Sequence, residues 1–161
     1  MKLGDFMKLI IKQKIISWFD SYNVYDEHGN IVYIIKGKLA WGHKFVVCDA
    51  NGRELGHIKE RIITFLPECE IYKDNIKIGS VKKKLTLFKP KYTCNLGDYE
   101  IDGDLWEFNY KVKKNRSVVA TVNRKFFSLA DTYTIDCQKE DSFNVLLIVV
   151  AIDAINCSNG N

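Results

Sequence analysis

The most constraining feature of the sequence is an apolar stretch near its end, FNVLLIVVAIDAI, which covers residues 143–155. A helix that spans a bilayer needs about 20 consecutive apolar residues. This stretch is shorter than that, and Asn144 and Asp153 interrupt it. A strand usually ends after about 4–8 residues, so the length favours a helix. The sequence therefore predicts a buried helix and no integral membrane span.

We expect this helix to cover about residues 142–156, with Asp141 and Ser142 as a candidate N-cap. Its middle is apolar on every side, so the helix must be enclosed by other elements. A barrel threaded by the helix is one enclosure, and a helix held between a sheet and another subunit is the alternative. Asp153 is expected near a barrel mouth, solvated or paired with a lysine, with a ligand-binding role as the alternative.

The rest of the chain, about residues 6–137, has the pattern of antiparallel hairpins. Residues 22–38 align with residues 45–61 at an offset of 23 positions, a shorter copy covers 69–84, and a fainter one covers 118–125. Each copy alternates apolar and polar residues on both sides of a turn rich in Gly, Asp and Asn. A 23-residue period also fits a solenoid, but only two copies agree well, which favours a hairpin meander.

Length and cysteine usage indicate one domain, residues 1–161, in a reducing compartment. The five cysteines are odd in number and widely spaced, without a CxxC motif. They therefore predict buried small hydrophobic side chains in a cytoplasmic protein, and neither disulfides nor a zinc site. We expect no metal and no cofactor.

Catalytic motifs are not evident in the sequence, and we predict that the protein is not an enzyme. None of the patterns HExxH, GxSxG or a Gly-rich phosphate loop occurs. His43 and Cys48, five residues apart on a predicted strand, would point to opposite faces. The acidic residues at 98, 100, 102 and 104 lack EF-hand spacing and are interpreted as a solvated turn.

Basic residues recur at the same two places in successive hairpins. These are Lys36 and Lys38, Lys59 and Arg61, Lys82 and Lys84, with Lys125 at the second place of the fourth copy. Residues i and i+2 share one face of a strand, so stacked hairpins would form a basic band on the outside of the barrel. Such lysines can simply keep a barrel soluble, or they can bind an anionic ligand. The tryptophans at 18, 41 and 106 are interpreted as packing residues, with interfacial anchoring as the alternative.

Several short motifs occur in order along the whole chain: YDEHGN (25–30), CDANG (48–52), LP before EIY (66–72), VKKK (81–84), LFKPKY (87–92), FS with DTY (127–133) and AIDAI (151–155). Together they resemble the LURP-one-related family of the tubby C-terminal-like superfamily. The resemblance implies a closed antiparallel barrel of about twelve strands around a central C-terminal helix. Tubby proteins in this superfamily bind phosphoinositide headgroups through a basic surface, and the related scramblases act at membranes.

These observations favour a non-catalytic binding or membrane-tethering module that recognises anionic phospholipid headgroups or an acidic protein, cytoplasmic or peripheral at a membrane. One alternative is a small-molecule-binding protein or enzyme with its site at a barrel mouth. Another is nucleic-acid binding, which the net charge of +4 permits. The aromatic residues form no RNA-binding signature, and the isoelectric point near 8.7 is low for such a role, so a nucleic acid is the less favoured partner. The sequence leaves the oligomeric state open.

Overall fold

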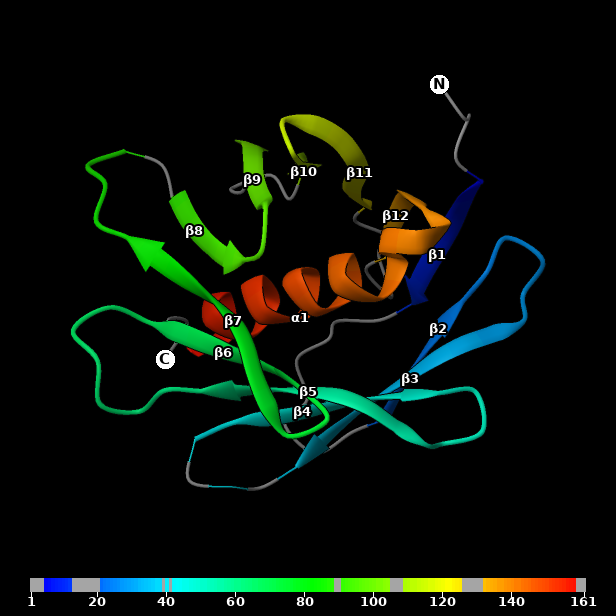
Figure 1. Ribbon diagram of the computed structural model, residues 1–161, viewed down its shortest axis with the longest axis horizontal. Helices are drawn as coiled ribbons and strands as arrows, with labels where there is room; N and C mark the ends of the chain where they lie inside the picture. Colours follow the sequence, from blue (N-terminus) through cyan, green and yellow to red (C-terminus); the bar gives the residue numbers. More distant parts are fainter. Residues whose placement is uncertain are drawn as a thin grey trace.

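The computed structural model describes residues 5–12, 21–38, 40, 42–88, 91–104, 109–125 and 132–158. Twelve strands precede a short 3-10 helix and one α-helix (Figure 1). The strands are β1 (Phe6–Lys12), β2 (Ser21–Tyr25), β3 (Ile31–Lys38), β4 (Lys44–Asp49), β5 (Glu54–Glu60), β6 (Glu68–Lys73), β7 (Ile76–Lys84), β8 (Lys91–Leu96), β9 (Tyr99–Asp104), β10 (Asn109–Lys114), β11 (Ser117–Lys125) and β12 (Thr132–Gln138). They are followed by η1 (Lys139–Asp141) and α1 (Ser142–Ser158).

Matching turns close the two best-aligned hairpins. Asp26 Oδ1 accepts hydrogen bonds from the backbone N–H groups of His28 and Asn30, and Asp49 Oδ1 accepts those of Asn51 and Arg53 in the same way. The glycine of each turn has φ near +83°, a conformation that glycine adopts without strain. The hydrogen bonds therefore explain why these two copies repeat most closely in the sequence.

Two-residue turns close the shorter copies. Asp74 and Asn75 join β6 to β7, while Asn115 and Arg116 join β10 to β11. All four have positive φ, from 49° to 66°, as in the type I′ turns that match the twist of a hairpin. The predicted hairpin meander is confirmed for the described strands.

All strands belong to one antiparallel 12-stranded sheet, in the order β8-β7-β6-β5-β4-β3-β2-β1-β12-β11-β10-β9. The first strand pairs with the last, from Phe6 opposite Gln138 to Lys12 opposite Thr132. The sheet begins at β8 and ends at β9, which are consecutive in the chain. The predicted barrel is thus correct, with its wall nearly closed and the seam between β8 and β9.

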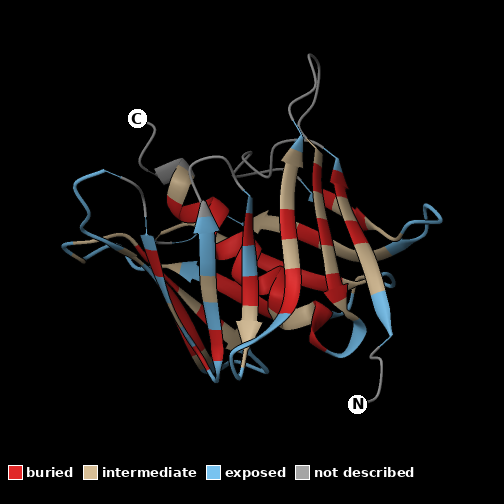
Figure 2. Ribbon diagram, turned by 90° about the horizontal axis from the view of Figure 1, so that it is seen from above, coloured by how far each residue is buried: buried red, intermediate tan, exposed pale blue. Residues whose placement is uncertain are grey.

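The α-helix lies inside this barrel, as predicted, and its residues from Val145 to Ile152 are all buried (Figure 2). Alternate strand residues, such as Leu9 and Ile11 on β1, join the helix in one hydrophobic core. The helix approaches β5, β6 and β7 more closely than the other strands. At Gly56 on β5, an added Cβ would lie 3.2 Å from the Phe143 ring and 2.6 Å from a backbone oxygen. A glycine is therefore needed where helix and wall meet.

Tyrosine side chains fill the wider gap on the other side of the helix. Tyr92, Tyr99, Tyr110 and Tyr133 are buried on β8, β9, β10 and β12. Asp153 is buried among them and accepts a hydrogen bond of 2.8 Å from the Tyr133 hydroxyl. The expectation of a solvated Asp153 was therefore wrong, because the barrel extends past this turn of the helix and supplies a phenolic donor.

The expected N-cap residues bond to the barrel wall. Asp141 accepts hydrogen bonds from the Tyr99 hydroxyl and, at 2.7 Å, from Lys114 Nζ. Ser142 Oγ lies 3.1 Å from the Tyr33 hydroxyl. These contacts fix the start of the helix to β3, β9 and β10.

The predicted burial of the cysteines is confirmed where the structure describes their side chains. Cys48, Cys69 and Cys137 are buried and Cys94 is half-buried, all as free thiols. Burial raises the pKa of Cys94 to about 11 and that of Cys137 to about 12, so these thiols stay protonated at neutral pH. The Cys157 side chain and the three tryptophans lie outside the described residues.

Candidate functional site

The alternating direction of the strands gives the barrel two unlike ends. Short polar turns join β2 to β3, β4 to β5, β6 to β7, β8 to β9 and β10 to β11 at one end, which we call the turn end. The connections from β3 to β4, β5 to β6 and β7 to β8 lie at the opposite end, which we call the loop end. The helix starts at the turn end and finishes at the loop end (Figure 1).

All seven predicted basic residues lie toward the loop end, since each lies on or just after the second strand of its hairpin. They are Lys36 and Lys38 on β3, Lys59 on β5, Arg61 just after it, Lys82 and Lys84 on β7, and Lys125 on β11. Lys125 is separated from the others by β2, β1 and β12. The structure therefore brings six of them to one part of the wall and leaves Lys125 apart.

Three lysines form a row across adjacent strands. Lys38 is opposite Lys44 in the β3–β4 ladder, and Lys44 is opposite Lys59 in the β4–β5 ladder. Their neighbours Ile58 and Phe45 are buried in the core, so the lysines face outward. Like charges directly opposite one another destabilise a sheet. A second pair of this kind is Lys84 opposite Lys91 in the β7–β8 ladder.

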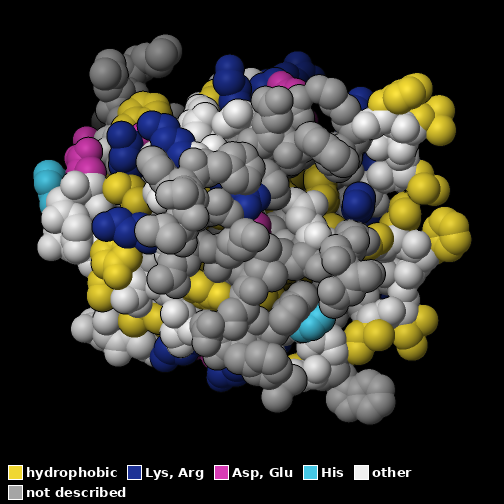
Figure 3. Space-filling view, turned by 180° about the vertical axis from the view of Figure 1, so that it is seen from behind, with side chains coloured by type: hydrophobic (Ala, Val, Ile, Leu, Met, Phe, Trp, Pro, Cys, Tyr) yellow, Lys and Arg dark blue, Asp and Glu magenta, His cyan; other side chains and the backbone are white. Residues whose placement is uncertain are grey.

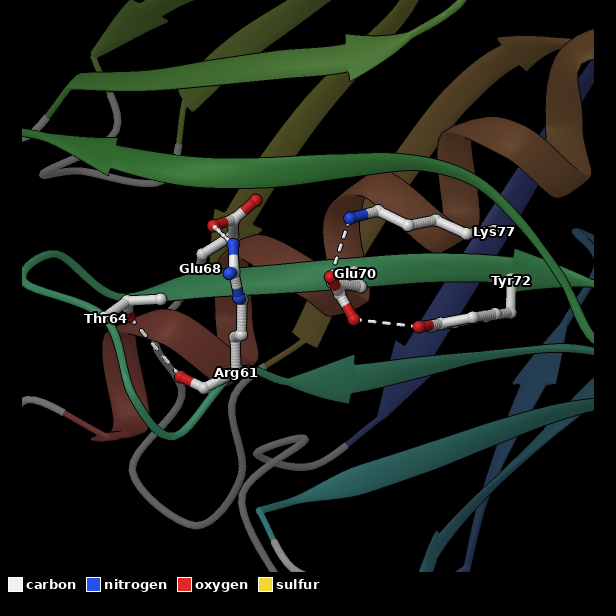
Figure 4. A network of polar contacts seen from close by, with 6 residues as sticks. All are labelled: Arg61, Thr64, Glu68, Glu70, Tyr72 and Lys77. Carbon is white, nitrogen blue, oxygen red and sulfur yellow. Dashed lines mark hydrogen bonds and ion pairs between the residues drawn. The ribbon is translucent and has the colours of Figure 1, made fainter.

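Two glutamates on β6 interrupt the predicted band (Figure 4). Arg61 Nη1 lies 3.3 Å from Glu68 Oε2. Glu70 accepts a 2.6 Å hydrogen bond from Lys77 Nζ and a 2.8 Å bond from the Tyr72 hydroxyl. The bond from Lys77 lowers the pKa of Glu70, so this carboxylate stays ionised well below neutral pH. The outer face of β5–β7 is therefore mixed in charge.

Six lysines toward the loop end of the outer face are in no ion pair within the part of the chain that the structure describes. They are Lys38, Lys44, Lys59, Lys82, Lys84 and Lys91, which we call the lysine rim. By contrast Lys8, Lys77 and Lys113 each lie within 4.0 Å of a carboxylate. Lysines outside ion pairs also occur elsewhere, such as Lys73 and Lys111, so the rim is distinguished by its place on adjacent strands near one end of the barrel.

Sequence reasoning missed three members of this surface. Lys44 precedes the aligned part of its repeat, so the 23-residue offset does not show it. Glu68 and Glu70 lie on β6, the first strand of the third hairpin. The repeated basic positions lie on or just after the second strand of each hairpin, so comparing them does not reveal these glutamates. Only the pairing of β5 with β6 and of β6 with β7 places these glutamates among the predicted basic residues.

Several other titratable groups have structural partners. His43 contacts Glu60, and the His57 ring stacks on Tyr72 with a centroid distance of 4.8 Å. Asp102, in the acidic segment, pairs with Lys113. Among residues 5–158, where described, no group of three or more His, Cys, Asp or Glu side chains is placed to hold a metal ion.

A surface hollow of about 810 Å³ opens beside the connection between β7 and β8. Its described lining consists of Leu85, Thr86, Leu87, Phe88 and Lys91. This lining is mostly apolar with one cation, and it lacks the converging polar groups typical of a catalytic pocket.

Comparison with known proteins agrees with this architecture. A family model described as LURP-one-related matches residues 7–153. The chain belongs to the LURP-one-related family.

A curated relative, the uncharacterized protein YxjI of Bacillus subtilis (strain 168), is 28% identical over 151 residues, which cover 92% of this chain and 93% of that protein. The X-ray structure of a protein from Arabidopsis thaliana is similar with a TM-score of 0.68 and 17% identity, covering 95% of this chain and 93% of the other. This likeness supports the fold. Among the described helices of the LURP-one-related domain, none is long and apolar enough to cross a membrane.

Proposed function

We propose that the protein is a non-catalytic module that attaches to anionic phospholipid surfaces through the lysine rim. The observation that supports this most directly is the row of Lys38, Lys44 and Lys59, three like charges held opposite one another on adjacent strands. The repulsion among them is relieved when an anionic surface lies over the row. Each basic residue near such a surface contributes about 1 kcal/mol to binding.

The filled barrel favours surface binding over the alternative of an internal ligand. Residues 145–152 of the helix are buried throughout and occupy the space that a lipocalin-type barrel leaves for its ligand. A protein that binds small molecules would have to use the outside of the wall or one of its ends. The lysine rim lies on the outside and toward one end.

The test is co-sedimentation with vesicles of phosphatidylcholine alone or mixed with phosphatidylserine. We expect binding to the anionic vesicles only, decreasing as salt is raised. The triple variant Lys38→Gln/Lys44→Gln/Lys59→Gln should lose roughly 100-fold in affinity. This is the effect of three contributions of about 1 kcal/mol each, added together.

A matched control removes the same charge from the paired lysines. Lys8→Gln/Lys77→Gln/Lys113→Gln changes the net charge equally but alters side chains that already contact carboxylates. This control should bind close to the parent protein. Equal binding to neutral and anionic vesicles at low salt would contradict the proposal, as would equal losses in the two triple variants.

A further inference from the structure

Two connections at the loop end expose large apolar side chains. The first covers residues 62–65 and the second covers residues 85–88, and we call them together the apolar loop pair. Their exposed apolar residues are Ile62, Ile63, Phe65, Leu85, Leu87 and Phe88. Four of these, at positions 63, 65, 87 and 88, are 91–93% exposed. Monomeric proteins rarely leave so many large apolar groups together in water, and such patches mark interaction sites.

Backbone hydrogen bonds join the bases of the two loops. The Arg61 N–H donates to the Glu68 carbonyl oxygen at 2.9 Å and closes the base of the first loop. The Lys83 N–H donates to the Pro67 carbonyl oxygen at 2.9 Å and joins that loop to the strand that leads into the second. Both loops project from the same edge of the molecule (Figure 1). Hydrophobic side chains protrude along this edge in the space-filling view (Figure 3).

Lysines lie at the base of the second loop, whereas Glu60 and Glu68 flank the first loop and contact His43 and Arg61. Neither residues 61–67 nor residues 85–91 include an Asp or a Glu. Lys82 and Lys84 end the strand before the second loop, and Lys91 begins the strand after it. All three belong to the lysine rim. Toward the barrel, the apolar tip of the second loop is thus followed by positive charge, and that of the first loop by the mixed charges of β5 and β6.

This order of layers fits an anionic bilayer better than a second copy of the chain. A bilayer presents negative headgroups first and hydrocarbon beneath them, so apolar tips and the lysines behind them both find matching layers. Two copies facing each other through this end would bring two cationic surfaces together, and such juxtaposition opposes association.

We propose that the apolar loop pair inserts into the boundary between headgroups and acyl chains of an anionic bilayer, with the barrel axis directed toward the membrane. This inference rests on the proposed function, because the lysine rim supplies the first attraction. It adds a second mode of contact that salt does not screen, and it assigns the orientation of the barrel.

The experiment measures insertion by fluorescence. Phe88→Trp places an indole in the second loop, and Ile76→Trp places one on an exposed site at the turn end. Each variant is mixed with phosphatidylcholine–phosphatidylserine vesicles whose acyl chains carry bromine, and quenching is compared with that of the parent protein. We expect additional quenching for Phe88→Trp and none for Ile76→Trp.

A variant set tests the contribution of the tips to binding. Ile63→Ser/Phe65→Ser/Leu87→Ser/Phe88→Ser should weaken binding to anionic vesicles at least tenfold and remove the part that resists high salt. The control Phe6→Ser/Ile31→Ser/Ile76→Ser removes exposed apolar groups from the turn end and should bind like the parent. Circular dichroism should show that both sets stay folded, because every replaced side chain is exposed.

The outcomes separate the two proposals. Salt-sensitive binding without quenching of Phe88→Trp overturns insertion and leaves the attraction by the lysine rim. Quenching that is equal with neutral and anionic vesicles supports insertion and contradicts the role of charge. Self-association in sedimentation that the four-residue variant abolishes, together with no binding to vesicles, overturns insertion in favour of an interface between copies.

Discussion

The connections between strands at the two ends of the barrel differ in length, polarity and charge. At the turn end, the hairpins close through a few polar residues whose side chains or left-handed backbone satisfy the turn. At the loop end, the connections are longer and carry apolar tips beside unpaired lysines. The turn end therefore contains what the fold requires, whereas the loop end carries groups that contribute little to folding.

The helix connects the two ends, so its removal should have the largest effect. Deletion of residues 143–155 takes away the middle of the hydrophobic core, and the inner faces of the strands would then face water. We expect no cooperative unfolding transition and no near-ultraviolet circular dichroism signal from this variant. A deletion variant that unfolds cooperatively would show that the barrel wall is stable without its helix.

A pair of single substitutions should separate the two ends in stability. Asp141→Ala at the turn end leaves Lys114 and the Tyr99 hydroxyl without their buried acceptor and should lower the free energy of unfolding by about 2–3 kcal/mol. Ile63→Ser in the apolar loop pair should change it by less than about 0.5 kcal/mol, because the side chain is exposed. Urea unfolding measures both.

The neighbour of Asp141 offers a control at the same end. Glu140 is exposed and precedes Asp141 in the 3-10 helix, so Glu140→Ala should be nearly neutral. If Ile63→Ser lowered the free energy of unfolding as much as Asp141→Ala, the two ends would not differ in their contribution to stability.

The smallest expected effect concerns the acid stability of the turns. A hydrogen bond from the Asn30 side chain lowers the pKa of Asp26, and one from the Arg53 backbone N–H lowers that of Asp49. A carboxylate whose pKa is depressed by folding stabilises the folded state above its unfolded pKa, near 3.9, and loses this contribution as pH falls further.

The double variant Asp26→Ala/Asp49→Ala should therefore be less stable than the parent by a constant amount from neutral pH down to about pH 4. Below that pH the difference should shrink. Urea unfolding at a series of pH values measures it. Parallel stability curves down to about pH 2 would show that the two carboxylates are not linked to folding.

Most of the architecture could be predicted from the sequence because its signals are local. The apolar stretch predicted the enclosed helix at 142–156 against the observed Ser142–Ser158, since a helix apolar on all sides can only be buried. The repeated Asp and Gly positions predicted the first two hairpins, because those residues make the turn themselves. The number of strands came from the family resemblance.

Features that depend on distant residues could not be predicted. Asp153 was expected to be solvated or paired with a lysine, because nothing near it in sequence indicates that Tyr133 on β12 would provide a hydrogen bond. The prediction of a continuous basic band was wrong for the same reason. Glu68 and Glu70 lie among the basic residues only because β6 pairs with β5 and β7. The seam between β8 and β9 depends on how far the wall curves around the helix, which no local pattern encodes.

The pairing of β1 with β12 has a consequence for the timing of folding during synthesis. β1 has a seven-residue ladder with β12, whereas its ladder with β2 comprises Ile10 and Ile11 among the described residues. A ribosome releases β1 before the other strands and β12 after them, with the helix later still. Contacts this far apart in sequence form slowly, so the wall stays open and its inner face exposed until β12 and the helix have been synthesised. A nascent chain stalled before residue 132 should therefore engage chaperones, whereas the released full-length chain can close around its helix.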